Sequence, residues 1–306
     1  MTKIIMYHYV KTFDRKLPYF NFLHKESFKK QIKFFENKFK INKIKDNDIF
    51  ENNKILLTFD DGTKDHYWVA NYLKKKNFKA IFFISTYPYE KKDFLDVHKL
   101  HLIFGKYKSS EIQEALKYLK IRNEKLKKNN LKKIKLYQIK SAKNNEELNK
   151  IKLKLQLSFY LKKGNNIIIN KIFNYFFSKK EQRNLFKKFY LTKKELMYMK
   201  KMGMILGSHS YSHSVLSKLN FKDQLRDIKK NKNLLKKLFN FKTDFFCYPY
   251  GGKYSYNKNT KKILKDLNYK FAFSVDNTDY TFKNNKLEIP RYNCNYFKHG
   301  KIFKKK

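Results

Sequence analysis

The chain has 306 residues, a length that allows one large domain or one domain with an insertion. Hydrophobic residues make up 42% of it, enough for a real core, and only 8 glycines and 4 prolines argue against a disordered or collagen-like chain. Lys and Arg total 72 against 26 acidic residues, a formal charge of +46, which leaves either a polyanion partner or compositional drift as the explanation.

Strand and helix signals alternate over the first part of the chain. Residues 3–10 form a short apolar run that predicts a strand, and 25–40 place their apolar side chains on one helix face. Residues 54–59 predict a buried strand, 64–76 a helix and 79–85 the next strand. Strand, helix and strand at this spacing indicate a βαβ unit with a parallel sheet.

Residues 105–190 differ from this pattern, because they are lysine-rich, lack proline and show only helical periodicity. We interpret them as a helical insertion or cap, with extra helices packed on the sheet as the alternative. Alternation then resumes with a Thr192/Glu195 capping box that begins a helix. The later signals are the helix 192–202, the strand 204–206, the helix 221–239, the strand 245–246, the helix 257–267 and the strand 271–275.

The repeated βα units predict an α/β fold, a (β/α) barrel that is distorted or incomplete. We expect residues 1–104 and 191–306 to form the barrel and 105–190 to form the insertion. In such a barrel the active site lies at the carboxyl ends of the strands, and the chemically informative residues of this chain all follow predicted strands.

The first motif is Thr58-Phe59-Asp60-Asp61-Gly62, at the end of a predicted strand. Neighbouring residues of a strand face opposite ways, so a turn permitted by Gly62 must bring both carboxylates to one point. One carboxylate can then bind a metal ion while the other acts as a base. The alternative is an ordinary Asp-Gly turn in which Asp61 caps the next helix.

The second motif is His209-Ser210-Tyr211-Ser212-His213. Histidines at i and i+4 lie on one face of a helix, a spacing suited to a single metal ion. With Asp61 they make a three-ligand site that leaves open positions for water and substrate. The alternative is one core histidine and one surface histidine.

These motifs resemble the polysaccharide deacetylase family, the NodB-homology carbohydrate esterases. Thr58 to Gly62 matches the first motif of that family and His209 to His213 its second, while Phe246 to Gly251 resembles the third. Asp276-Asn277-Thr278-Asp279-Tyr280 resembles the fourth, an Asp-x-x-Asp-aromatic pattern. The matching blocks span about half of the chain.

The resemblance implies a distorted (β/α) barrel of the NodB-homology type and hydrolysis of N- or O-acetyl groups. It implies that Asp60 is the general base and that Asp61, His209 and His213 bind a divalent metal, usually Zn²⁺, with Co²⁺ or Ni²⁺ in some members. The backbone N–H of Tyr250 would stabilise the oxyanion. Asp276 and Asp279 would support the site.

Two departures from the family pattern concern the general acid and the partner of the base. Cys247 stands where the third motif usually has an arginine, and the region around Arg291 has no histidine where the fifth motif usually supplies one. A branch resembling the poly-N-acetylglucosamine deacetylases takes its acid from an N-terminal strand, so we expect His8 to be the acid. We expect Arg291 to replace the missing arginine beside Asp60 or Asp276, with a surface salt bridge as the alternative.

His98 and His101 follow the second predicted strand of the βαβ unit and are candidates for contact with substrate or phosphate. They could also form a second metal site if an acidic residue joins them. The remaining alternative is that they are ordinary histidines on a helix surface.

The charge itself favours drift over a specific partner, because only five of the 72 basic residues are arginine, the residue preferred for bidentate phosphate contacts. We therefore expect no specific nucleic acid partner. No stretch reaches 18 apolar residues, and the first apolar run is too short for a signal peptide. We expect a cytoplasmic protein that contacts the anionic inner membrane peripherally.

The sequence thus predicts an enzyme that removes N-acetyl groups from an amino sugar in cell-surface polysaccharide or lipopolysaccharide biosynthesis. The expected substrate is nucleotide-linked or lipid-linked. Alternatives are a deformylase or a peptidoglycan deacetylase of the same family and, outside enzymes, a polyanion-binding protein on a degenerate barrel. The two cysteines, Cys247 and Cys294, are not in CxxC motifs and predict neither a disulfide scaffold nor a thiolate zinc site.

Overall fold

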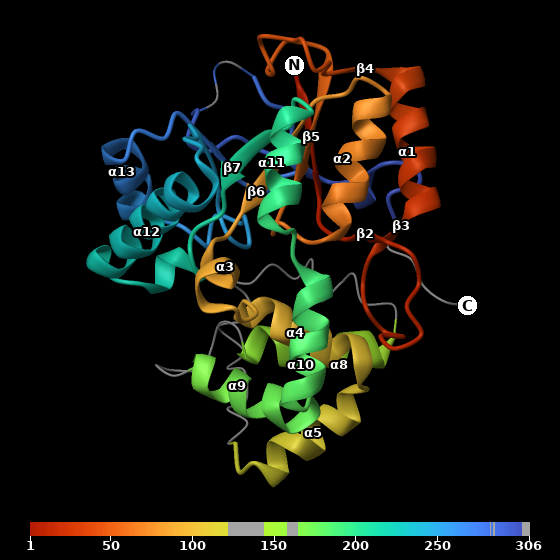
Figure 1. The fold of residues 1–306 in the computed structure, drawn as a ribbon, viewed down its shortest axis with the longest axis vertical. Coiled ribbons are helices and arrows are strands. Elements are labelled where there is room, and N and C mark those ends of the chain that lie inside the picture. Colours follow the sequence, from red (N-terminus) through yellow and green to blue (C-terminus); the bar gives the residue numbers. More distant parts are fainter. Residues whose placement is uncertain (122–143, 158–164, 282, 284, 302–306) are drawn as a thin grey trace.

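The computed structural model describes residues 1–121, 144–157, 165–281, 283 and 285–301 (Figure 1). The part of the predicted insertion in 122–143 and 158–164 lies outside the described residues. The described strands are β1 (Lys3–Tyr7), β2 (Val10–Lys11), β3 (Leu23–His24), β4 (Lys40–Ile41), β5 (Lys54–Phe59), β6 (Ala80–Ile84), β7 (Ile205–Ser208), β8 (Phe245–Cys247), β9 (Phe271–Phe273) and β10 (Tyr292–Asn293).

The helices of the described chain are α1 (Lys25–Lys38), α2 (Asp65–Lys75), α3 (Tyr87–Lys91), α4 (Asp96–Lys106), α5 (Ser109–Tyr118), α8 (Asn145–Leu155), α9 (Asn165–Phe176), α10 (Lys179–Phe189), α11 (Lys193–Lys201), α12 (Phe221–Phe239) and α13 (Lys258–Asp266). Two short 3-10 turns, η2 (Leu216–Lys218) and η3 (Cys294–Tyr296), complete them. The predicted helix 221–239 and the predicted strand 54–59 coincide with α12 and β5.

The main sheet has the strand order β10-β1-β5-β6-β7-β8-β9, with β4 paired to the start of β5. Its ladders are all parallel. The central strands are continuous apolar runs, such as Ala-Ile-Phe-Phe-Ile in β6, because both faces of a parallel sheet are covered. The sheet curls into a half-barrel surrounded by helices, which confirms the predicted distorted (β/α) barrel.

One short segment, residues 289–293, links the two edges of the curled sheet. At one end, Ile289 exchanges backbone hydrogen bonds with Ala272 and Ser274 at and beyond β9. At the other end, Tyr292 and Asn293 form β10 and pair with β1. Arg291 lies between these contacts, so its side chain starts from the seam of the barrel.

Helices α4, α5, α8, α9 and α10 gather on one side of the sheet and form what we call the helical lobe (Figure 1). Their apolar faces share a second core cluster with the chain that follows β1, including Tyr9 and Phe20. The first core cluster instead lies between the sheet and α1, α2, α11 and α12. The sequence boundaries 104/105 and 190/191 of the insertion stay a prediction.

Within the described residues, each helix is too short or too polar to cross a membrane.

Candidate active site

The two aspartates of the first motif follow β5 directly and turn to different partners. Asp60 continues the strand, with its N–H bonded to the carbonyl of Tyr7 at 3.0 Å. Asp61 then adopts a left-handed backbone, with φ at 83°, and Gly62 follows at 66°. The turn expected at Gly62, which brings the two carboxylates together, therefore involves a left-handed backbone at Asp61 as well as at Gly62. A side chain at residue 62 would also meet Ile84, whose Cδ1 lies 2.9 Å from the Cβ position.

The predicted helical face for His209 and His213 is wrong, because the chain between them is a loop after β7. Ser210 and His213 both have left-handed backbones, with φ at 60° and 56°. This tight loop still brings the two rings together, with centroids 4.8 Å apart. The i, i+4 spacing thus predicted the meeting of the histidines but not the structure that produces it.

Asp61, His209 and His213 form one buried group whose ligand atoms all lie within 4.8 Å of one another. The Oδ1 atom of Asp61 is 3.5 Å from Nε2 of His209 and 3.4 Å from Nε2 of His213. Among the described residues that oxygen has no hydrogen-bond partner, although it is buried. A buried carboxylate oxygen without a partner is costly, and a cation would offset that cost.

The donor set itself fits a divalent metal ion. His209 donates Nδ1–H to the carbonyl of Cys247 at 2.8 Å, which turns Nε2 toward Asp61. Two imidazole nitrogens and one carboxylate oxygen are the ligands typical of a catalytic zinc site with open positions. Burial lowers the pKa of His213 to about 3, so its ring is neutral and able to bind a metal.

Asp60 is held by Arg291, which is completely buried. The guanidinium donates Nη1–H to Oδ1 and Nη2–H to Oδ2 of Asp60, each at 2.8 Å. Burial raises the pKa of Asp60, but the Arg291 charge and hydrogen bonds outweigh burial and bring it to about 2. Of the two carboxylates considered from sequence, Arg291 therefore pairs with Asp60 and not with Asp276.

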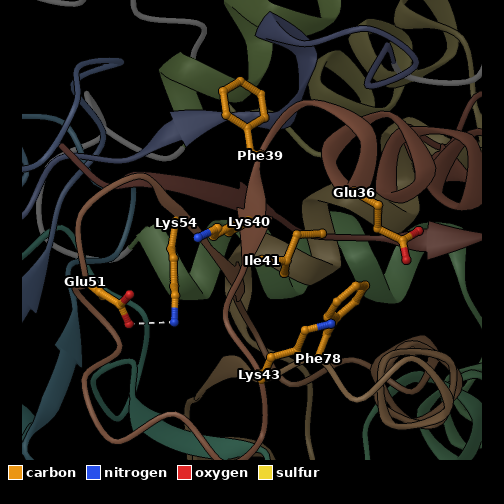
Figure 2. Close-up of a pocket in the computed structure, with 8 residues that line it drawn as sticks. All are labelled: Glu36, Phe39, Lys40, Ile41, Lys43, Glu51, Lys54 and Phe78. Atoms are coloured by element: carbon orange, nitrogen blue, oxygen red, sulfur yellow. Dashed lines mark ion pairs between the residues drawn. The ribbon is translucent and has the colours of Figure 1, made fainter.

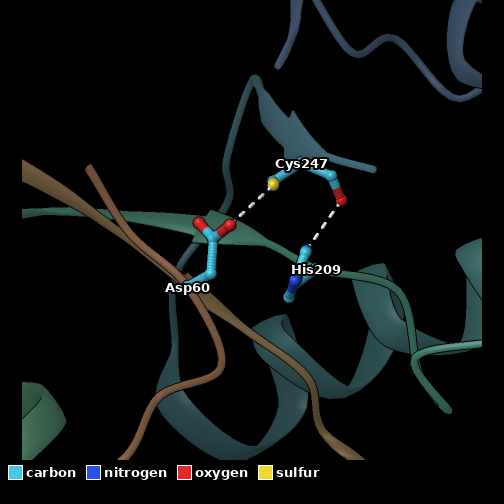
Figure 3. A group of neighbouring side chains, drawn as sticks. All are labelled: Asp60, His209 and Cys247. Carbon is cyan, nitrogen blue, oxygen red and sulfur yellow. Dashed lines mark hydrogen bonds between the residues drawn. The ribbon is translucent and has the colours of Figure 1, made fainter. Parts of the chain in front are cut away.

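Cys247 lies beside this pair, with Sγ 3.6 Å from Oδ2 of Asp60 (Figure 3). Its Sγ is also 3.0 Å from Nη2 of Arg291. Asp60, His209 and Cys247 also form a compact group of metal-ligand atoms. Both oxygens of Asp60 already accept hydrogen bonds from Arg291, so this second group suits a metal ion less well than the first.

His8 lies in the break between β1 and β2, in a chain that was predicted as one strand from 3 to 10. His66 Nε2 donates to the carbonyl of His8 at 2.7 Å, and Asp65 accepts from the N–H of Val10 at 2.6 Å. Burial lowers the pKa of His8, while the charges of Asp60 and Asp61 oppose that shift. The parallel pairing of Tyr7 with Phe59 puts His8 at the level of Asp60 in the sheet, and His66 and Asp65 hold the backbone on either side of His8.

His98 and His101 are on α4 and are not the ordinary surface histidines of the alternative interpretation. His98 is fully buried, with Nε2 3.2 Å from Oδ2 of Asp61 and Nδ1 2.6 Å from Oη of Tyr190. His101 is partly exposed and bonds Oη of Tyr9 at 2.8 Å. His98 thus contacts the carboxylate of a candidate metal ligand, and His101 lies one helical turn further along.

The remaining sequence candidates differ in position. Tyr250 is near the site, since its ring centroid is 5.0 Å from that of His213, and its backbone is left-handed with φ at 64°. Asp276 pairs with Lys253 at 3.4 Å, near the seam of the barrel. Asp279 is not brought to the site, because it pairs with Lys3 at 2.7 Å, at the opposite end of β1 from His8.

Asp227 of α12 supports the site and was not found from sequence. Its carboxylate accepts from the N–H of Tyr211 at 2.8 Å, the N–H of Ser212 at 3.1 Å and the hydroxyl of Ser212. It therefore anchors the loop that carries both histidines. A polar residue on an amphipathic helix gives no sequence signal of this role.

A surface pocket elsewhere is lined by Glu36, Phe39, Lys40, Ile41, Lys43, Glu51, Lys54 and Phe78 and has a volume of about 440 Å³ (Figure 2). It lies at β4 and the first residue of β5, and so at the amino ends of the strands. The Asp and His side chains described above lie at the carboxyl ends, where (β/α) barrels carry their active sites. This pocket is therefore not the candidate active site.

Solved structures share this fold over nearly the whole chain. The Streptococcus pyogenes deacetylase PplD is 18% identical, with a TM-score of 0.55, covering 95% of this chain and 91% of its own. The BpsB deacetylase domain from Bordetella bronchiseptica is 14% identical, with a TM-score of 0.52, and the match covers 95% of this chain and 96% of that domain. A de-N-acetylase from Aggregatibacter actinomycetemcomitans is 11% identical, with a TM-score of 0.52, and the match covers 95% of this chain and 94% of that protein. No curated protein sequence matches the chain significantly.

A half-barrel with an Asp-His-His group and an arginine-held carboxylate at its carboxyl end is the architecture of a carbohydrate deacetylase. The family model for polysaccharide deacetylase matches residues 126–272, a range that holds the histidine loop and the segment around Tyr250. The match covers just under half of the chain, so the chain is similar to this family, and together with the structural likeness it indicates a carbohydrate deacetylase enzyme. This assignment argues against the non-enzymatic alternative of a polyanion-binding protein.

Proposed function

We propose that the protein is a metal-dependent hydrolase that removes N-acetyl groups from an amino sugar in cell-surface polysaccharide or lipopolysaccharide biosynthesis. One observation carries the proposal: the ionised carboxylate of Asp60, held by Arg291, adjoins the buried group of Asp61, His209 and His213. A base beside a set of metal ligands is what metal-assisted hydrolysis of an amide requires.

Asp61, His209 and His213 would hold the divalent ion, with Zn²⁺ as the proposed metal and Co²⁺ or Ni²⁺ as alternatives. When bound, the ion would polarise the acetyl carbonyl and lower the pKa of the attacking water. His98 would orient Asp61 through its contact with Oδ2, since outer partners of a ligand fix its geometry.

Asp60 would accept the proton of the attacking water through one of its carboxylate oxygens. Arg291 would keep that carboxylate ionised and fixed in orientation, because its guanidinium bonds both oxygens. His8 would donate a proton to the nitrogen of the leaving amine, and the backbone N–H of Tyr250 would stabilise the developing oxyanion. The parallel register of β1 and β5, which pairs the residues just before His8 and Asp60, supports this assignment.

The test is acetate release from N-acetylated sugars, measured with and without a chelator. We expect chelation to abolish release and zinc to restore it. Asp60→Asn and His8→Gln should each lower kcat by about 10²- to 10⁴-fold while zinc still binds stoichiometrically, because they remove proton transfer and not ligands. Full acetate release by Asp60→Asn would contradict the mechanism, and formate release from N-formyl sugars would favour the deformylase alternative.

A further inference from the structure

The helical lobe brings one amine to the edge of the candidate active site. Lys154, near the end of α8, places Nζ 2.7 Å from Nε2 of His101 on α4. Since an ammonium group can only donate, Nε2 of His101 accepts, and its Nδ1–H then donates to Oη of Tyr9 at 2.8 Å. Lys154, His101 and Tyr9 thus form one hydrogen-bonded row.

Lys154 has no carboxylate partner among the described residues, unlike other partly or fully buried lysines of the same two helices. Lys150, one turn earlier on α8, pairs with Glu146 at 3.3 Å, and Lys99 on α4 pairs with Asp93 at 2.7 Å. Burial lowers the pKa of Lys154 to about 8, with Asp61 as the charge that opposes the shift. A cation in this position is destabilised unless an anion joins it.

The row begins beside the reacting groups. Tyr9 follows His8 in the chain, and the His101 ring lies 6.0 Å, centroid to centroid, from that of His98, which contacts Asp61. His8, His101 and Lys154 are partly exposed, whereas Asp60 and Asp61 are buried. A substrate whose acetyl group reaches the aspartates would therefore have its outer part near Lys154.

We infer that Lys154, seated on His101, binds an anionic group of the amino-sugar substrate, either a carboxylate or a phosphate. This inference rests on the proposed function and adds a substrate class to it: acetamido sugars that carry a negative charge, in place of neutral polymers. The helical lobe would then supply substrate selection while the half-barrel supplies the reacting groups.

The experiment compares three substrates on the zinc-loaded protein. The probes are chitotetraose, which is neutral, a peptidoglycan tetrasaccharide with N-acetylmuramic acid, which carries carboxylates, and UDP-N-acetylglucosamine, which carries a diphosphate. We expect one anionic probe to exceed the neutral one in kcat/KM, and the better of the two identifies the source of the charge. Lys154→Met should lower the ratio of kcat/KM for the anionic probe to kcat/KM for chitotetraose by about 10- to 100-fold, the range for a hydrogen bond to a charged group.

The matched control is Lys150→Met, which removes an amine from the same helix and should leave the ratio unchanged. Lys154→Arg keeps the charge and should retain the preference for the anionic probe. A wild-type protein that hydrolyses chitotetraose as well as both anionic probes would overturn the inference and leave the proposed function standing, and this comparison needs no variant. An unchanged ratio in Lys154→Met would overturn it equally, whereas no acetate release from any sugar would count against the proposed function itself.

Discussion

At the scale of single residues, the candidate site depends on a buried ion pair whose members are far apart in sequence. Arg291 bonds both oxygens of Asp60 and also donates to Thr58 at 3.1 Å and to the carbonyl of Ser274 at 3.1 Å. All three nitrogen atoms of the guanidinium therefore donate hydrogen bonds. Cys247 occupies the position where the resemblance led us to expect an arginine, and the charge comes from the seam of the barrel instead.

We predict that Arg291→Gln lowers both activity and stability. Removing one member of a buried pair leaves the other charge uncompensated, which typically costs 3–5 kcal/mol. Without Arg291, burial would raise the pKa of Asp60 and disfavour the ionised base, so kcat should fall by about a hundredfold or more. Urea unfolding and acetate release measure the two effects.

The control is Arg226→Gln, which breaks the exposed pair of Arg226 and Asp223 on α12. An exposed pair contributes about 0–1 kcal/mol, so this variant should unfold close to the wild type. Equal stability of the two variants would mean that the Arg291 pair is not the buried anchor described here.

Left-handed backbones are the residue-scale feature that sequence could not reveal. Asp61, Ser210, His213 and Tyr250 all have positive φ, although none is glycine. Such residues cost of order 1–3 kcal/mol each and persist where surrounding contacts enforce them, often at functional sites. The contacts that enforce them come from distant parts of the chain, so no local pattern announces them.

At the scale of elements, periodicity predicted strands and helices well. Apolar runs gave β5 and β6, and amphipathic spacing with caps gave α11 and α12 within a residue or two. The error at His209–His213 has a physical reason, because an i, i+4 pair can meet across a tight loop as well as on a helix. The contact of His98 with Asp61 was also beyond prediction, since it depends on how α4 packs beside the turn that follows β5.

The loop between the two histidines depends on one element, α12, through Asp227. We predict that Asp227→Ala weakens zinc binding by about 10- to 100-fold, the usual cost of losing an outer partner of a metal ligand. The reason is that the N–H groups of Tyr211 and Ser212 lose their acceptor and the loop loosens. Competition with a chromogenic chelator measures the affinity.

Asp223→Ala, one turn earlier on α12, is the matched control, because the Asp223 carboxylate is partly exposed and contacts Asn220 and Arg226 instead of the histidine loop. Its zinc affinity should equal that of the wild type. If Asp227→Ala also bound zinc as tightly as the wild type, the loop would hold its shape without α12.

At the scale of the whole molecule, metal binding should be visible as stability. A ligand that binds only the folded state stabilises it by about 4 kcal/mol at a thousandfold excess over Kd. For a chain of this size each kcal/mol corresponds to roughly 2–4 °C in Tm. We therefore predict a rise of roughly 10 °C when zinc is added to metal-free protein, measured by calorimetry.

The Asp61→Asn variant should lose most of this rise, because it removes the charged ligand that both histidines face. A full zinc-dependent rise in this variant would show that zinc binds elsewhere, for example at exposed side chains.

Residues 289–293, the seam of the barrel, must be folded for Arg291 to hold Asp60 in the candidate active site. The same five residues pair with β1, bond the chain at β9 and carry the arginine that holds Asp60. Local opening of such a short edge segment costs less than global unfolding. Mild denaturant should therefore release the seam first, so that hydrolysis ends, and amides of β10 exchange with solvent, while the central strands are still folded.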